Sequence, residues 1–199
     1  MALMAAAGVV VALVVVQKFT SSALPGMGKA RTSSNEVSAV ASLRVINSAQ
    51  ASYSSGCTSG GFAITLEDLA RIPPNQSAPF ISSDLGRNGI TKSGYILTIE
   101  KDERPGVRDI GTAASTCNGA ADNPVSSYFA SAAPATPGSS GVRYFATDAR
   151  GIVFASTEPI DNPIVESDTV KPVQGGELLE KQGGLATAAL PSEKAADSQ

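Results

Sequence analysis

The residue types that most often perform chemistry are scarce in this chain of 199 residues. It contains no histidine, so the commonest general base and metal ligand of proteins is missing. Acidic residues are adjacent at Glu67-Asp68 and at Asp102-Glu103, but such pairs are typical of helix starts and solvated turns. The glycine and serine step at residues 138–141 is not followed by a lysine and indicates a turn rather than a phosphate loop. The sequence therefore predicts no enzyme activity, no cofactor and no bound metal.

The two cysteines, Cys57 and Cys117, each lie among Gly, Ser, Thr and Asn residues. Such surroundings are typical of loops, and an exposed cysteine pair in loops is more often a disulfide of an exported protein than two buried thiols. A Cys57–Cys117 disulfide would close a loop of about sixty residues and stabilise the fold by about 4 kcal/mol. Two unrelated free thiols are the alternative.

The first 25 residues form an apolar segment, without a single polar side chain from residue 2 to residue 16. Fifteen helical residues reach about 22 Å, which is short of the ~30 Å hydrocarbon core of a bilayer. Extension to Leu24 closes the gap, with Lys18 reaching the interface. We expect a retained membrane helix; a cleaved secretory signal and a buried core helix are the alternatives.

The charges next to this segment and the cysteines favour opposite compartments. Lys18, Lys29 and Arg31 all follow the apolar run, and the positive-inside rule would then place the body of the chain in the cytoplasm. The cysteine pair favours export. We give the cysteines more weight, because a specialised export route need not follow the charge rule.

A break at Pro25 and Gly26 separates the apolar segment from an amphipathic stalk helix, expected over residues 26–54. The stalk carries apolar side chains at helical spacing, which predicts one face that packs on a sheet. Asn35, Glu36 and Arg44 lie largely off that face, as does Asn47. The residues expected on the packing face are Ala39, Val40, Leu43, Ile46, Gln50 and Tyr53.

Residues 55–157 form the expected head, a small antiparallel sheet of three to four strands. Alternating patterns predict strands at 95–100 and 126–132, and a hairpin at 142–146 and 151–156. Thr65 is expected to cap a short helix, and residues 86–91 are expected to be loop. The predicted fold class is α+β, with a long N-terminal helix, apolar in its first half and amphipathic in its second, packed on this sheet.

The charge is uneven along the chain. Residues 158–199 carry eight acids against three lysines, and the rest carries ten acids against twelve bases. The last segment is therefore expected to be an extended acidic tail with little structure of its own. The nearly neutral body has no basic stripe, so no nucleic-acid partner is predicted.

The stalk and several separated segments of the head share ordered residues with a known family. The segments 66–70, 91–95, 136–148 and 151–153 of the head, together with the stalk, resemble a bacterial subgroup of the type IV pilins and the related pseudopilins. The resemblance covers roughly residues 20–157. In the stalk the matching residues are Pro25, Arg31, Asn35, Glu36, Ser38, Ala39, Val40, Leu43, Arg44, Ile46 and Asn47.

The resemblance implies a structural subunit of an extracellular type IV pilus-like filament. Such subunits wait in the inner membrane and are then stacked helically with copies of themselves by a pilus or secretion assembly machinery. The alternative is a membrane-tethered periplasmic module, or a minor pseudopilin of a secretion or DNA-uptake machine. The residues expected in the filament core or membrane are Ala5, Gly8, Val9, Val10, Val11, Leu13, Val14, Val15 and Val16.

Two features depart from the family pattern. The family has a basic leader and a glutamate near the mature N-terminus, whereas here no acid precedes Glu36. We therefore expect either that Met1 is the mature terminus or that the chain is a divergent or unprocessed relative. The tail beyond residue 157 is also longer than the resemblance explains, and we expect it to decorate the filament or to drape over a neighbouring subunit.

Overall fold

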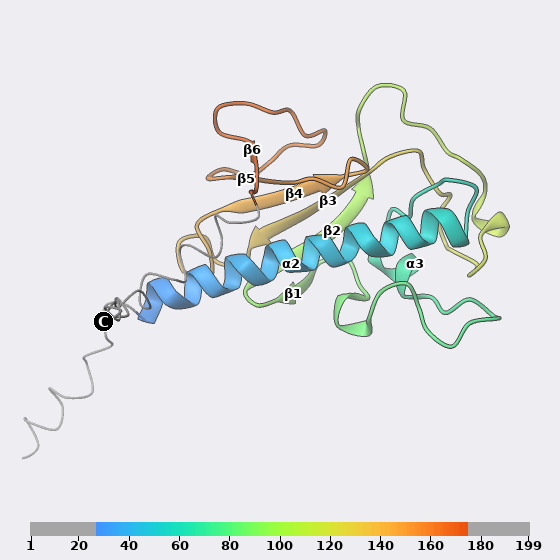
Figure 1. Cartoon of the computed structure of the whole chain (residues 1–199), viewed down its shortest axis with the longest axis horizontal. Helices are drawn as coiled ribbons and strands as arrows, with labels where there is room; N and C mark the ends of the chain where they lie inside the picture. Colours follow the sequence, from blue (N-terminus) through green and yellow to red (C-terminus); the bar gives the residue numbers. More distant parts are fainter. Residues whose placement is uncertain (1–26, 175–199) are drawn as a thin grey trace, which may run out of the picture.

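The computed structural model describes residues 27–174, in which one long helix crosses an antiparallel sheet (Figure 1). Helix α2 (Met27–Gly56) comes first, and six strands follow as a meander in the order β1-β2-β3-β4-β5-β6. The predicted α+β class, with an N-terminal helix on an antiparallel sheet, is confirmed. The strands are β1 (Ile90–Lys92), β2 (Tyr95–Lys101), β3 (Tyr128–Pro134), β4 (Tyr144–Asp148), β5 (Val153–Ser156) and β6 (Lys171–Pro172).

The sheet has six strands, so the expected three to four was wrong. The two additional strands are its edges. Strand β1 overlaps a stretch expected to be loop, and β6 lies in the segment expected to have little structure. Strands of three and two residues are too short to show an alternating pattern, and they form because a longer neighbour offers free backbone N–H and C=O groups.

The apolar segment and the break at Pro25 and Gly26 lie outside the described residues, as do the predicted filament-core residues and residues 175–199 of the tail. None of the helices within residues 27–174 combines the length and the apolar character that crossing a bilayer requires.

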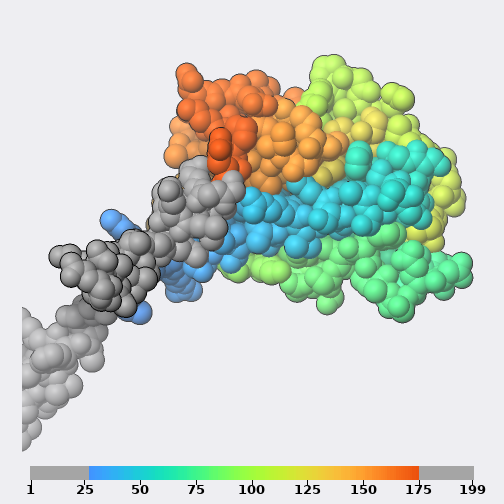
Figure 2. Space-filling view, in the orientation of Figure 1, coloured from blue at the N-terminus to red at the C-terminus, as the bar shows by residue number. Residues whose placement is uncertain are grey.

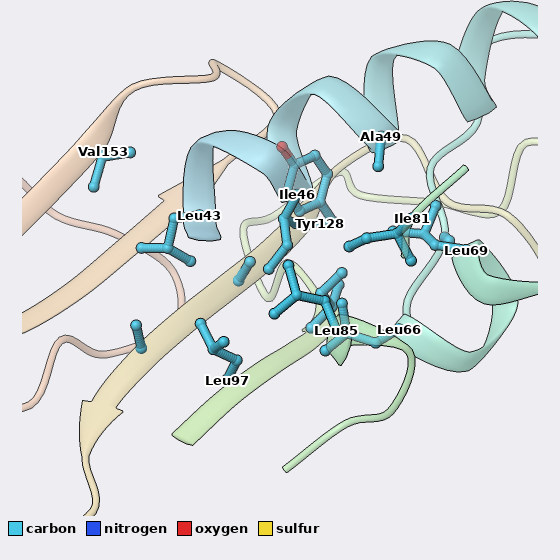
Figure 3. Close-up of a cluster of buried hydrophobic side chains, with 14 of the residues drawn as sticks. Leu43, Ile46, Ala49, Leu66, Leu69, Ile81, Leu85, Leu97, Tyr128 and Val153 are labelled. Atoms are coloured by element: carbon cyan, nitrogen blue, oxygen red, sulfur yellow. The ribbon is translucent and has the colours of Figure 1, made fainter. Parts of the chain in front are cut away.

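The main core lies between α2 and the sheet. Leu43 and Ile46 of α2 point into the same cluster as Leu97 of β2, as Figure 3 shows. Side chains of the short helix α3 (Leu66–Ala70) and of the 3-10 helix η1 (Ser83–Leu85) close this cluster at one end. The α2 side chains buried in it are Ala39, Val40, Leu43, Ile46, Ala49 and Tyr53, at positions that recur with the helical period.

A second, smaller core lies on the opposite face of the sheet. Successive β3 residues alternate, so Tyr128 and Ala130 face α2 whereas Phe129 faces away from it. Phe129 packs with Phe154 and with Ile164, which belongs to the segment 157–170 between β5 and β6. The first part of the expected tail is therefore ordered, because it covers apolar side chains that the sheet would otherwise expose.

The Cys57–Cys117 disulfide is present and joins the end of α2 to the long connection between β2 and β3. Cys57 is buried at the edge of the main core, so its expected position in an exposed loop was wrong. The 3-10 helix η2 (Ala113–Ser115) precedes Cys117. The bond holds a connection that contains little regular structure against the end of the helix.

We predict that replacing both cysteines by serine lowers the free energy of unfolding by about 4 kcal/mol, because the unfolded chain gains the entropy of an open sixty-residue loop. Urea denaturation of the full chain in mild detergent measures this. Ser52→Ala, on the exposed side of α2, is the control and should change stability by less than about 0.5 kcal/mol. Equal stability of the serine variant and the wild type would contradict the prediction.

Candidate functional site

The candidate site is the joint between α2 and the sheet, which polar side chains fasten at three levels along the helix. The first level is Glu36. Its carboxylate accepts hydrogen bonds from the backbone N–H of Val142 at 3.1 Å and from Nε of Arg143 at 2.9 Å. The two charged side chains are 5% and 12% exposed, and the Arg143 guanidinium also lies over the ring of Phe145. Glu36 was expected off the packing face and is instead part of it.

Hydrogen bonds hold the loop before β4 in the conformation in which it contacts Glu36. The Tyr95 hydroxyl donates to the carbonyl of Arg143 at 2.8 Å, and the Asn35 amide donates to the carbonyl of Ser140 at 2.8 Å. A side chain at Gly141 would overlap the Tyr95 ring, so only glycine fits there. Burial, and secondarily the charge of Glu36, raise the pKa of Tyr95, which keeps its hydroxyl a hydrogen-bond donor.

The second level is Asn47, near the middle of α2. Its side-chain oxygen accepts hydrogen bonds from the Tyr128 hydroxyl at 2.8 Å and from the Thr147 hydroxyl at 3.1 Å. Its amide nitrogen donates to the carbonyl of Gly151 at 2.9 Å. One side chain therefore ties α2 to β3, to β4 and to the turn between β4 and β5. Burial, and then the charge of Asp148, raise the pKa of Tyr128.

The third level is Gln50, which is fully buried. Its side-chain amide pairs with the backbone of Ala63, accepting from the N–H at 2.9 Å and donating to the carbonyl at 2.7 Å. These two hydrogen bonds satisfy the backbone N–H and C=O of Ala63, as a neighbouring strand would. They hold the chain that follows Cys57 against the helix.

Buried carboxylates fasten the head itself. Asp148 accepts from Arg104 at 2.9 Å and from the backbone and side chain of Arg150. Asp102 accepts from the Ser127 hydroxyl at 2.6 Å, and Asp68 accepts from the backbone N–H of Ala121 at 2.7 Å. Asp102 was expected in a solvated turn and is buried. It accepts from the nearby backbone N–H of Arg104 and also from Ser127, which lies 25 positions further along the chain and gives no local signal.

These groups are arranged to hold the fold together. Within residues 27–174 no three side chains of the metal-binding types lie close enough to share an ion. A hollow of about 510 Å³ lies beside Asn47, but its lining contains no charged residue. The joint consists of several separate contacts, all of which must break before α2 can slide along the sheet.

The structure brings Ala39, Val40, Leu43, Ile46 and Tyr53 together at the joint. Glu36 and Asn47 were missed as members of the joint, although a signal for them exists. The signal is a spacing of alternately four and three positions, which connects residues 36, 40, 43, 47 and 50. This spacing places Glu36, Asn47 and Gln50 on one helix face with Leu43. Gln50 was expected there. Asn47 and Glu36 have no apolar character, and their partners lie about a hundred positions further along the chain.

Comparisons of this chain with protein-family models, with curated proteins and with solved structures found no match.

We predict that Glu36→Leu lowers the free energy of unfolding by about 3 kcal/mol, because it removes the carboxylate that the buried Arg143 side chain and the Val142 N–H contact. Chemical denaturation measures this. Arg44→Leu, on the exposed side of α2, is the control with a change below about 0.5 kcal/mol. Adding Arg143→Met to Glu36→Leu should recover part of the loss, because two apolar side chains then face each other. A Glu36→Leu variant as stable as the control would refute the role of the pair.

The carboxylate of Asp148 should make stability depend on pH. Burial alone would raise the pKa of Asp148, but hydrogen bonds and charge from Arg150 and Arg104 outweigh it and hold the pKa below its usual range. The unfolded chain then binds a proton more readily than the folded one. The stabilisation is complete well above pH 4 and is lost as the pH falls through the lower, folded value.

We predict that Asp148→Asn is less stable than the wild type at pH 7 but loses less further stability between pH 5 and pH 3. Denaturation curves at a series of pH values measure both effects. Asp84→Asn is the matched control, because Asp84 pairs with Lys92 on the surface, where water screens the charges. Parallel pH profiles for the wild type and Asp148→Asn would contradict this assignment.

Proposed function

We propose that this chain is a structural subunit of an extracellular type IV pilus-like filament, assembled helically through its apolar N-terminal segment. One observation carries the proposal. Helix α2 follows directly after the apolar segment in the sequence, and hydrogen bonds fasten its inner face to the head from Glu36 to Gln50. A subunit that is held in a polymer by its N-terminal segment needs its head firmly attached to the helix that continues from that segment.

The resemblance to type IV pilins supports the same function from the sequence. The family's long helix and antiparallel sheet are the elements that this chain has. Exchanging lipid for neighbouring apolar helices keeps the segment 1–25 buried before and after assembly. Small residues such as Ala5 and Gly8 allow helices to approach closely. The partners are therefore copies of the chain, the inner membrane before assembly, and an assembly machinery.

The geometry of the joint suits a subunit under tension. A pull on the N-terminal segment would load α2 along its axis and shear it against the sheet. Glu36, Asn47 and Gln50 share this load, because each bonds a different part of the head. The Cys57–Cys117 disulfide joins the C-terminal end of α2 covalently to the connection between β2 and β3. The head would stay attached even if one contact opened.

A second candidate is a membrane-tethered periplasmic module or a minor pseudopilin. One feature favours it: none of the first 35 residues is acidic, whereas the family uses an acid near its N-terminus to pair with a neighbour's terminal amine. An unpaired ammonium in an apolar core is unfavourable. A chain that does not polymerise, or that polymerises only briefly, avoids that cost.

Electron microscopy of material sheared from cells, with mass spectrometry of the subunit, tests the proposal. We expect thin filaments built of this chain. A chain found only in the membrane fraction, without filaments, would replace the first candidate with the second.

A variant separates the two candidates in the same cells. We predict that Val15→Lys abolishes filaments but leaves the chain in the membrane. A lysine near the end of the unbroken apolar run 2–16, one turn before Lys18, reaches the interface of a lone anchor but is buried by neighbours in a filament core. Val15→Leu is the control and should assemble normally. Filaments of normal yield from Val15→Lys would contradict a filament core at this position.

A further inference from the structure

The described part of the chain has two outer surfaces that differ in charge. Helix α2 covers one face of the sheet, and the segment 157–170 covers the other. Figure 1 shows the helix and this segment on either side of strands β4 and β5, and Figure 2 shows α2 uncovered along one face of the molecule. We ask what the uncovered side of α2 contacts.

The uncovered side of α2 carries one cation, Arg44, among small side chains. Arg44 is exposed and has no ion-pair partner within residues 27–174, and the one acid of α2, Glu36, is buried on the side that faces the head. Lys29 and Arg31 are exposed at the other end of the helix, beside loops of the head. A groove of about 330 Å³ runs beside Arg44, where Ser48 and Ser52 leave room. Its apolar lining comes from Val45, Ala49 and Phe80, and Val45 is 47% exposed.

The segment on the opposite face is acidic and carries one apolar projection. Glu158, Asp161, Glu166 and Asp168 are exposed. Val165 lies among them and is 71% exposed. Its position is fixed from both sides, because Ile164 is buried in the second core and Glu166 accepts a hydrogen bond from Arg150 at 2.9 Å. A partner that covered Val165 would remove its apolar surface from water.

We propose that Val165 of one copy seats in the groove beside Arg44 of the next copy, with the acids around Val165 facing Arg44. This rests on the proposed filament and names a contact between its subunits. The occupant is a second copy because the acids beside the exposed Val165 are opposite in charge to Arg44 beside the apolar groove. They lie on opposite faces of one sheet, so a chain cannot satisfy its own groove with its own Val165.

The placement of the two surfaces also determines the kind of assembly. The proposed groove and projection are different surfaces of each copy, so joining them is head-to-tail rather than two-fold symmetric. Such a contact continues from copy to copy and gives an open helical polymer unless the rotation closes into a ring. Burying Val165 supplies apolar area, and the opposite charges orient the approach and make the contact sensitive to salt.

Cysteine cross-linking tests the contact in cells that express the full chain. Ser48→Cys and Val165→Cys are combined in one chain, and a short bis-maleimide is added, which reacts with free thiols and leaves the Cys57–Cys117 bond untouched. We expect a ladder of covalent oligomers on a denaturing gel. Each single variant should stay monomeric, and a mixture of the two single variants should stop at dimers, because neither chain has both ends.

A matched control and a charge exchange sharpen the test. Ser48→Cys with Val142→Cys places the second thiol at another exposed valine, outside the proposed contact, and should give at least tenfold less oligomer. Arg44→Glu should reduce the ladder about tenfold, and adding Asp161→Lys with Asp168→Lys should restore part of it. A restored ladder requires that the two regions face each other.

The outcomes distinguish this contact from the filament itself. Filaments that form without a ladder overturn the contact and leave the filament. A ladder in membranes without any filaments supports the contact and overturns the proposed function. Dimers from Val165→Cys alone overturn the head-to-tail arrangement, since a two-fold contact would bring two copies of that residue together.

Discussion

The burial of one side of α2 against the sheet is the contact on which the rest of this structure depends. Full burial of a Leu or Ile side chain contributes about 1.5–3 kcal/mol, and Leu43, Ile46 and Tyr53 are all fully buried there. Apolar burial has no preferred direction and would let a helix slide. Glu36 and Asn47 remove that freedom, because each requires partners at one position only.

The second face of the sheet also buries apolar side chains, but a segment without regular structure covers it instead of a helix. Phe129 and Phe154 point away from α2, and a sheet exposing both to water would be open to association. The segment after β5 covers them, and Arg150 holds it by bridging Asp148 and Glu166. The head is therefore three layers, helix, sheet and segment, and its two outer layers differ in charge.

A filament subunit makes two demands that this arrangement serves. It must transmit tension from its N-terminal rod to its head, which the joint along α2 does without relying on one contact. It must also meet identical copies through two different surfaces, since a surface that pairs with itself stops at a dimer. The groove beside Arg44 and the projection at Val165 are two such surfaces. Under the proposed function, α2 serves both demands: its inner side is fastened to the head, and its outer side would contact a neighbouring copy.

Repeating patterns in the sequence were enough to predict α2 with its apolar face and the longer strands. They also favoured a disulfide over two free thiols, which the structure confirms. The other features depend on contacts between distant parts of the chain. The strands β1 and β6 exist because longer neighbours pair with them. The burial of Glu36 depends on an arginine 107 positions away, and the order of the segment 157–170 depends on Phe129 and Phe154. Local pattern reports which side of an element is apolar, whereas a buried charge or a short edge strand is stable only when a distant partner is already in place.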